Sequence, residues 1–360
     1  MKTNQRSRTA IIPALLSLSA LSTQAMAAPV SQQAVDLAYR QQQEQRVETR
    51  SLLFPAFGPA NREFAAAPGP YAVATDAVVG DCRGLVGLIA KLVLLDATVK
   101  CDAAFPYGFD DPISTSVYYP RNIGQLGKRP VVVFAGGILS NPGQYAPMVE
   151  HWASQGFIVM NVGDFINSTP VMPLLGLNEL IRMDRDPASP LYAKVDLGRV
   201  VIAGHSAGGQ AAIQTGSFAP ALQAAIDPRL RIVGVLPIEP GPLGLSATLQ
   251  APTLILSGAA DVVVPAIAWP NLWQDPHLQR LPAWGATARF ATHFSPVREL
   301  KYNEFGGIAT AFLRYVGLDD ARAKAYFVGP NYKLSLDEQF VPSVWPIVGV
   351  DRNAAAAGLK

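Results

Sequence analysis

The segment that decides the fold is Arg199-Val200-Val201-Ile202-Ala203-Gly204-His205-Ser206-Ala207-Gly208-Gly209-Gln210-Ala211-Ala212-Ile213-Gln214. It opens on a run rich in Val and Ile, as expected for a strand buried on both faces of a sheet. The small residues at its end predict a helix. The G-x-S-x-G motif lies between them, and its two glycines are needed because side chains there would clash across so sharp a turn. In this strand–turn–helix context the motif presents Ser206 as a nucleophile on a strained turn.

The chain beyond this segment alternates between short apolar runs and helical patterns. Strands are predicted at Thr115–Tyr119, Val131–Ala135, Phe157–Val162, Arg199–Ala203, Arg231–Leu236, Thr253–Ser257 and Ala286–Ala291. Helices are predicted near residues 143–155, 176–185, 207–217 and 303–316. This alternation predicts an α/β protein with a mostly parallel central sheet flanked by helices. Together with the serine motif, it predicts the α/β-hydrolase fold.

A serine nucleophile needs a general base, and that base needs an acid to orient it. In α/β-hydrolases the three follow in the chain order serine, acid, histidine. Asp261 follows the strand 253–257, at the end of the sheet where sites of open α/β proteins lie. His293 follows the last predicted strand in a short polar turn. We therefore predict Ser206, Asp261 and His293 as the catalytic residues; Asp227 is the nearest rival acid, but Asp227-Pro228 is typical of a turn.

The three other histidines are interpreted as structural. His205 lies beside the nucleophile, and we expect its side chain to point away from the site. His151 lies on a predicted helix upstream of Ser206, and His277 lies in a loop well before the last strand.

An oxyanion hole requires backbone N–H groups aimed at the negative charge that develops on the substrate. One is expected from Ala207, the residue after the nucleophile. The second is expected from the loop Ala135-Gly136-Gly137-Ile138-Leu139, most simply from Ile138, with Gly137 as the alternative. We also expect Gly137 and Leu139 to contact the substrate.

Composition excludes several classes of protein. The chain has 360 residues, of which 49% are hydrophobic and 16% charged, so it can bury a sizeable core and a disordered chain is excluded. Its 29 basic and 27 acidic residues form no basic runs, which argues against a nucleic-acid partner. Two cysteines and four histidines are too few and too scattered for a structural zinc site. We expect no metal and no organic cofactor.

The first residues resemble an export signal. Lys2, Arg6 and Arg8 precede an apolar stretch from residue 10 to 21, and an A-x-A cleavage pattern ends at Ala27. The apolar stretch is too short to span a membrane. We predict a signal peptide over residues 1–27 and a secreted or periplasmic protein, with an uncleaved anchor as the alternative. Removing three basic residues leaves 26 basic against 27 acidic residues, a net charge of −1.

Export bears on the two cysteines, because an oxidising compartment favours disulfides. Cys82 and Cys101 are predicted to pair, with two buried free thiols as the alternative. Between them, residues 83–100 show apolar residues at helical spacing. This helix either packs on the core or caps a binding cleft.

The domain organisation follows from these features. Residues 28–68 are expected to be an N-terminal extension, of which 54–70 resembles a proline-rich linker. A catalytic domain is expected over 69–330, with an insert at about 80–110. Residues 331–360 are expected to be a C-terminal extension, with a frayed end at Ala354–Ala357. We expect a monomer that does not insert stably into a membrane.

Several stretches resemble the cutinase-like polyester hydrolases, a family of secreted serine esterases that includes PET hydrolases. The resemblance is more distant to chlorophyllase and dienelactone hydrolase relatives. It covers about residues 69–317. It rests on Gly69-Pro70-Tyr71, Ser116-Val117-Tyr118-Tyr119-Pro120, Trp152-Ala153-Ser154-Gln155-Gly156-Phe157-Ile158-Val159, Ser189-Pro190-Leu191-Tyr192-Ala193-Lys194-Val195-Asp196 and Ala251-Pro252-Thr253-Leu254-Ile255. The order and spacing of Ser206, Asp261 and His293 are similar too.

Two departures from the family bear on the substrate. Polyester hydrolases of this family carry an aromatic residue at the position of Ile138 and a Trp at the position of Gly241, and the pair clamps an aromatic ring of the polymer. The resemblance therefore implies a substrate-binding role at Gly241 but leaves activity on aromatic polyesters open. The insert at 80–110 and the C-terminal extension have no counterpart in the family.

The sequence thus predicts a secreted serine carboxylester hydrolase that works through an acyl-enzyme. Its expected substrate is an apolar ester, either a small molecule, a lipid or an aliphatic polyester. Two alternatives remain: an acyltransferase or amidase with the same three residues, and a hydrolase-fold protein that binds a lipid or partner without turnover.

Overall fold

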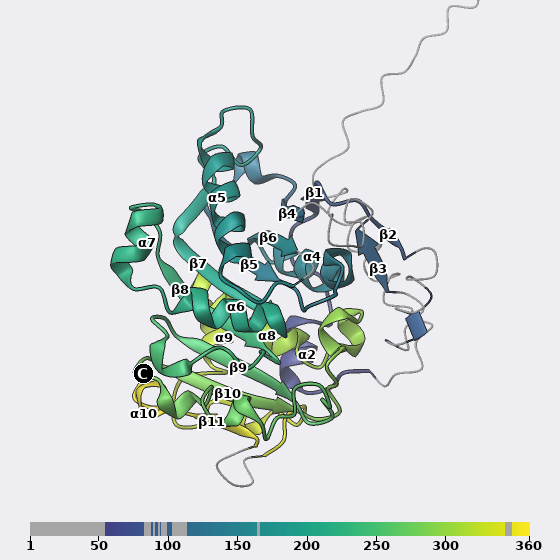
Figure 1. The fold of residues 1–360 in the computed structure, drawn as a ribbon, viewed down its shortest axis with the longest axis vertical. Helices are drawn as coiled ribbons and strands as arrows, with labels where there is room; N and C mark the ends of the chain where they lie inside the picture. The colour runs from purple at the N-terminus through teal and green to yellow at the C-terminus, as the bar shows by residue number, and fades with distance from the viewer. Residues whose placement is uncertain are drawn as a thin grey trace, which may run out of the picture.

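The computed structural model describes residues 55–82, 88, 91–92, 94, 99–102, 114–163, 166–342 and 348–360 (Figure 1). The described strands are β1 (Val73–Thr75), β2 (Val79–Asp81), β3 (Lys100–Asp102), β4 (Ser114–Pro120), β5 (Arg129–Ala135), β6 (Ile158–Gly163), β7 (Val195–His205), β8 (Ile232–Ile238), β9 (Thr253–Gly258), β10 (Ala283–Ala288) and β11 (Val350–Arg352). The described α-helices are α2 (Pro59–Phe64), α4 (Ala146–Ser154), α5 (Val171–Arg185), α6 (Ala207–Gly216), α7 (Pro220–Ile226), α8 (Gly306–Leu318), α9 (Ala321–Lys324) and α10 (Ala354–Ala357).

A nine-stranded sheet forms the centre of this part of the chain, in the order β1-β4-β6-β5-β7-β8-β9-β10-β11. The strands from β6 to β10 in this order run parallel to one another. β4 and β1 are antiparallel at one edge, and β11 is antiparallel at the other. This mostly parallel sheet, flanked by helices (Figure 1), confirms the predicted α/β-hydrolase fold.

Two hydrophobic layers cover the sheet, one on each face. On β5, Val132 and Phe134 pack with residues of α4 and α8, such as Trp152 and Phe312. The intervening residues of β5 pack on the opposite face with residues of α5 and α6, such as Leu177, Ala212 and Ile213. Both layers are almost fully buried. The continuous apolar runs of the sequence follow from this arrangement, because a strand between two helical layers has no solvent-facing side.

The predicted central strands from β4 to β9 agree with the structure within a few residues, whereas β10 lies earlier than predicted. It pairs with β9 from Ala283 to Ala288, in register with Thr253 to Gly258. Phe290, which the prediction placed inside the strand, has a left-handed φ of 62° and lies in the following loop. The alanine-rich sequence of this strand carried too little periodicity to fix its register.

Two segments predicted as irregular are ordered helices. Residues 59–64 of the predicted linker form α2, where Pro59 starts the helix and Ala60 and Phe64 join the core. The predicted frayed tail forms α10, where the Asn353 side chain accepts a hydrogen bond from the Ala356 N–H. Just before α10, β11 completes the central sheet. These two predictions were therefore wrong, because tertiary contacts order short segments that have weak propensity.

The predicted disulfide is present between Cys82 and Cys101. It links β3 to the residue that follows β2, its partner in a two-stranded sheet. Most of the helix predicted at 83–100 lies outside the described residues. Leu88, Leu92 and Leu94 are helical; the first two are exposed and Leu94 is buried. Lys100 belongs to β3 instead.

The predicted signal peptide, residues 1–27, lies outside the described residues. Among the residues described, no helix combines the length and the apolar character needed to cross a bilayer.

Candidate active site

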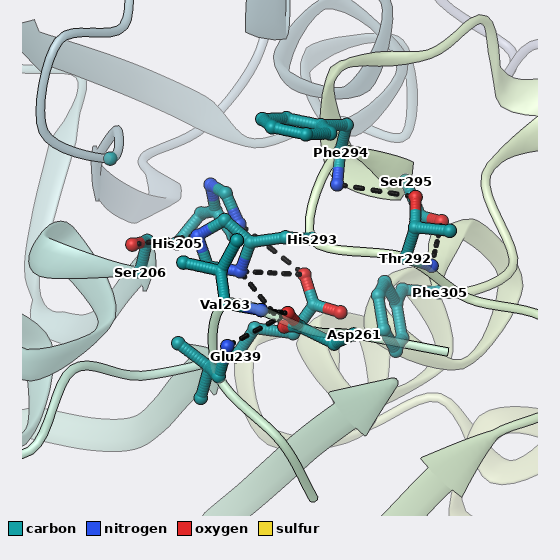
Figure 2. A network of polar contacts seen from close by, with 12 residues as sticks. His205, Ser206, Glu239, Asp261, Val263, Thr292, His293, Phe294, Ser295 and Phe305 are labelled. Carbon is teal, nitrogen blue, oxygen red and sulfur yellow. Dashed lines mark hydrogen bonds and ion pairs between the residues drawn. The ribbon is translucent and has the colours of Figure 1, made fainter. Parts of the chain in front are cut away.

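Five neighbouring strands of the sheet bring the predicted site residues together. In the order β5-β7-β8-β9-β10, their carboxyl ends lead to the glycine-containing loop 136–139, Ser206, Glu239, Asp261 and His293. Since parallel strands end at the same edge of a sheet, residues far apart in the sequence meet there. The chain order serine, acid, histidine therefore becomes a compact cluster in space (Figure 2).

Ser206 lies on a strained turn between β7 and α6. Its φ of 54° and ψ of −118° lie outside the regions that a non-glycine residue normally occupies. The turn is tight enough to exclude side chains at both motif glycines. A Cβ on Gly204 would lie 2.2 Å from the Gly208 oxygen, and one on Gly208 would lie 2.0 Å from the Ala135 oxygen. The strain and the need for both glycines are as predicted.

His293 lies between Ser206 and Asp261 and forms a hydrogen bond with each (Figure 2). Its Nε2 is 2.9 Å from Ser206 Oγ, and its Nδ1 is 2.8 Å from Asp261 Oδ2. The other Asp261 oxygen accepts the backbone N–H groups of Val263 and Val264 at 2.7 and 2.8 Å. Burial opposes ionisation of Asp261, but the hydrogen bond and charge of His293 and these two N–H groups outweigh it and lower its pKa. Asp261 is thus held as a charged acceptor.

Ala207 and Ile138 are the two expected oxyanion donors. Among the described residues, no protein group accepts a hydrogen bond from either backbone N–H. Ala207 is the first residue of α6, where helix N–H groups have no partner in the helix. Ile138 lies in the loop after β5. The alternative donor, Gly137, is a poor candidate because its N–H already donates to the Tyr145 hydroxyl at 2.8 Å. Gly137 still borders the nucleophile, since a Cβ built on it would lie 3.2 Å from Ser206 Cβ.

The prediction that His205 points away from the site was wrong. Its ring is buried and lies 4.7 Å from the ring of His293, centroid to centroid. His205 Nδ1 is 2.8 Å from the Tyr145 hydroxyl, and its Nε2 is 3.3 Å from Glu239 Oε2. Burial holds the pKa of His205 well below its usual range, and the charge of His293 lowers this pKa further. A hydrogen bond with the backbone of His293 acts in the opposite direction but does not outweigh them. His205 is therefore a neutral polar group behind the site.

Glu239 is the site residue that sequence reasoning missed. Its side chain is fully buried, and Oε2 lies 3.9 Å from His293 Nδ1. Burial is the main cause that raises the pKa of Glu239 well above its usual range, and the nearby Asp261 carboxylate adds to it. A signal was available in the sequence, because β8 lies between the strands that carry Ser206 and Asp261. Glu239 is the first titratable residue after the carboxyl end of β8.

The residues expected to contact the substrate differ in exposure. Ile138 and Leu139, in the loop after β5, are about half exposed, at 51% and 59%, and Val262 and Val263, in the loop after β9, are 87% and 51% exposed. We call these four residues the apolar rim. Gly241 is buried, and its N–H donates to the Ser206 carbonyl at 2.9 Å. A Cβ on Gly241 would lie 2.9 Å from Gln210 Oε1, so Gln210 occupies the space beside this glycine.

Asp227, His151 and His277, which were not predicted as catalytic residues, bind other groups away from Ser206. Asp227 is bound by the Arg229 side chain, whose hydrogen bonds lower its pKa to about 2. His151 contacts the Phe64 carbonyl through Nε2 at 2.6 Å. His277 lies 3.2 Å from Asp351 near the sheet edge formed by β11.

Two clusters have atoms close enough together to ligate a metal ion within the described part of the chain. His205, Glu239 and His293 form one, and Asp275, His277 and Asp351 form the other. In the first, a metal would have to replace the hydrogen bond from His293 Nδ1 to Asp261, because a nitrogen cannot donate and coordinate at once. In the second, the ion pair of His277 with Asp351 accounts for the arrangement. We therefore interpret the first as part of the surroundings of the His293–Asp261 hydrogen bond and the second as an ion pair.

In a comparison with known proteins, the chain is similar to cutinases and to a PET hydrolase-like family. A family model described as PETase, PET hydrolase-like, matches residues 104–275, a stretch that contains Ser206 and Asp261 and ends before His293. Cutinase 2 of Thermobifida cellulosilytica is 26% identical over 244 residues, covering 65% of this chain and 85% of the relative. Cutinase est1 of Thermobifida alba is 26% identical over 259 residues, 69% of this chain and 80% of the relative. Bis(hydroxyethyl) terephthalate hydrolase of Streptomyces coelicolor is 29% identical over 188 residues, 50% of this chain and 55% of the relative. The chain thus has the α/β-hydrolase fold, and its sequence is similar to those of cutinases and of PET hydrolase-like proteins.

Proposed function

We propose that the protein is a secreted serine carboxylester hydrolase with Ser206, His293 and Asp261 as its catalytic residues. One observation carries the proposal: Ser206 Oγ lies 2.9 Å from His293 Nε2, and His293 Nδ1 lies 2.8 Å from Asp261 Oδ2. This arrangement on a strained turn is the one that serine acyl transfer needs. The related cutinases and the terephthalate ester hydrolase support an ester as the bond that is cleaved.

In the proposed mechanism, His293 takes the proton of Ser206 as its oxygen attacks the ester carbonyl. The oxyanion accepts hydrogen bonds from the N–H groups of Ala207 and Ile138. His293 then gives the proton to the leaving alcohol, and an acyl-enzyme forms on Ser206. Water, deprotonated by His293, attacks this acyl-enzyme and releases the acid. Asp261 keeps the Nδ1 hydrogen of His293 in place and stabilises the imidazolium.

The proposed substrate is an ester with an apolar acyl part, either a small ester, a lipid or an aliphatic polyester. The apolar rim supports this class, because exposed hydrophobic residues beside a site gain free energy when an apolar ligand covers them. The names of the relatives support a polymeric ester as one member of this class. Ile138 and Gly241 provide no aromatic ring that could clamp an aromatic unit.

Secretion is part of the proposal. The signal-like segment 1–27 supports it, and so does the disulfide between Cys82 and Cys101, since disulfides persist in oxidising compartments. Export would bring the site into contact with esters and polymers outside the cell.

A hydrolysis series on p-nitrophenyl esters from acetate to palmitate tests the proposal. Wild type, Ser206→Ala and the control Ser217→Ala are compared; the Ser217 hydroxyl contacts Thr248 and the Ile213 carbonyl. We expect Ser206→Ala to lose at least about a thousandfold in kcat/KM and Ser217→Ala to match wild type. A fluorophosphonate probe should label wild type and Ser217→Ala only. Turnover that survives in Ser206→Ala would contradict the proposed nucleophile, and labelled protein without ester turnover would favour an amide or thioester substrate.

A further inference from the structure

Behind the catalytic residues, the fold builds a place for the carboxyl group of Glu239. This residue directly follows β8 and has a φ of 45°, in the left-handed region that non-glycine residues avoid. Its side chain is fully buried. Gly258, at the end of β9, borders this carboxyl group: a Cβ there would lie 2.5 Å from Glu239 Oε1 and equally close to the Ala291 carbonyl oxygen. The strained backbone that holds this buried carboxyl group indicates a functional constraint.

The groups that face Glu239 come from four directions. His205 at the end of β7 lies 3.3 Å away and His293 after β10 lies 3.9 Å away, each measured from ring nitrogen to Oε2. Asp261 after β9 is close enough to affect its ionisation, and Arg298 and Glu304 lie further off as an ion pair of 3.6 Å. No Lys or Arg among the described residues pairs with Glu239 itself. A buried carboxylate beside Asp261 without such a cation would be costly, so the neutral acid is favoured.

A chain of polar contacts leads from Glu239 to the oxyanion loop. The Gly137 N–H donates to the Tyr145 oxygen at 2.8 Å, and the Tyr145 hydroxyl forms a hydrogen bond with His205 Nδ1, also at 2.8 Å. The other ring nitrogen of His205, Nε2, faces Glu239 Oε2 at 3.3 Å. All of these groups are buried. The loop that holds Ile138 is thereby connected, through Tyr145 and His205, to the acid side of the site.

We propose that Glu239 is a positioning residue: a buried carboxylic acid that keeps its proton and, through His205 and Tyr145, joins the Asp261–His293 pair to the oxyanion loop. This inference rests on the proposed esterase function. Neutral Glu239 leaves Asp261 as the one negative charge beside His293. A second negative charge there would hold a proton on His293 and make it a poor base. The carboxyl group also fixes the ring of His205, and with it Tyr145 and the loop around Gly137.

Two variants of Glu239 test this role, with the exposed Glu338→Gln as the matched control. We expect Glu239→Gln, which resembles the neutral acid, to keep kcat/KM for a p-nitrophenyl ester within about threefold of wild type and to leave the acid limb of the pH profile unmoved. Glu239→Met fills the space without a polar group, and it should lower kcat by about tenfold or more with little change in KM. Glu338→Gln should match wild type in both respects.

Urea unfolding gives a second readout that needs no activity. A carboxyl whose pKa is raised by folding stabilises the protein below its unfolded pKa, and this contribution is lost as the pH rises and the unfolded chain releases its proton. The stability of Glu239→Gln relative to wild type should therefore increase between about pH 5 and pH 8. Glu338→Gln should show no such trend. This result is obtained even if the wild type hydrolyses no ester, so failure here and failure of the esterase proposal can be told apart.

Three results would overturn the inference. An acid limb that moves to lower pH by about one unit in Glu239→Gln would mean that Glu239 is ionised. Wild-type kcat in a folded Glu239→Met would mean that it positions nothing. A relative stability of Glu239→Gln that does not change with pH would mean that the carboxyl gains no proton on folding. If Glu239→Met does not fold, the pH profile and the urea unfolding of Glu239→Gln still decide whether Glu239 keeps its proton.

Discussion

The front and the back of the site have opposite chemical character. The front is the apolar rim, whose four residues expose between 51% and 87% of their surface. The back consists of Tyr145, His205 and Glu239, which are polar and almost completely buried. Globular proteins usually place apolar groups inside and polar groups outside. The inversion suggests a division of labour, in which the front receives an apolar substrate and the back maintains the geometry of the reacting groups in a low-dielectric environment.

Asp261 lies between front and back, and its loss should have the largest effect. We expect Asp261→Asn to lower kcat by about 10⁴-fold, because an amide at this position favours the wrong tautomer of His293. KM should change little, since the Asp261 side chain is buried and bonds to His293 and to two backbone N–H groups. Steady-state kinetics on p-nitrophenyl butyrate measures both, with Asp319→Asn, an exposed aspartate in a left-handed turn, as control. A loss smaller than about tenfold would show that Asp261 does not orient the base.

Tyr145→Phe removes the link between the back and the oxyanion loop. The buried Gly137 N–H and His205 Nδ1 would both lose their partner. We expect kcat to fall roughly tenfold to a hundredfold with KM nearly constant, because a displaced oxyanion donor weakens transition-state binding. The stability should fall by about 1–3 kcal/mol in urea unfolding, since two polar groups become unsatisfied. Tyr192→Phe, at a half-exposed tyrosine, is the control. If Tyr145→Phe lowers the free energy of unfolding but leaves kcat unchanged, the buried polar residues behind the site have only a structural role.

Val262→Ser changes the front alone and should have the smallest effect. Val262 is 87% exposed, so its substitution leaves the fold intact. If a long acyl chain covers this residue, KM for long-chain esters should rise about three- to fivefold, while kcat/KM for the acetate ester stays the same. Val78→Ser, on an exposed valine next to β2, serves as control. An equal effect on short and long esters would mean that the acyl chain does not lie on this part of the rim.

The same contrast separates what could be predicted from the sequence from what could not. Ser206 and Asp261 follow strands with strong apolar runs, and all three catalytic candidates, His293 included, stand in short loops with recognisable chemistry. Their meeting point could therefore be predicted from chain order. Their distances are a property of the fold. The role of His205 could not be predicted in this way, because the direction of its side chain depends on Tyr145 and Glu239, which come from different elements. Glu239 stands in a run with two prolines that resembles an ordinary turn.

The outer parts of the fold were harder to predict for a different reason. α2 and β11 are short, and neither has the periodicity or the apolar content of a central element. α2 is held by distant contacts, such as the Asn61 side chain accepting the Gly307 N–H and Asp337 accepting the Ala60 N–H. Contacts of such sequence separation leave no local pattern. Local propensity therefore gave the centre of the sheet correctly and missed its edges.

The left-handed backbone at Ser206 has a consequence for how such a protein can adapt. Leu139, Asn167 and Glu239 share this unfavourable conformation, so four non-glycine residues around one centre are strained. Each costs about 1–3 kcal/mol of stability. A glycine at position 206 would relieve part of this burden and abolish the chemistry. Substitutions that raise the thermal stability must therefore lie away from the active site. The strained positions around Ser206 would gain the most stability, but changing them would remove the activity.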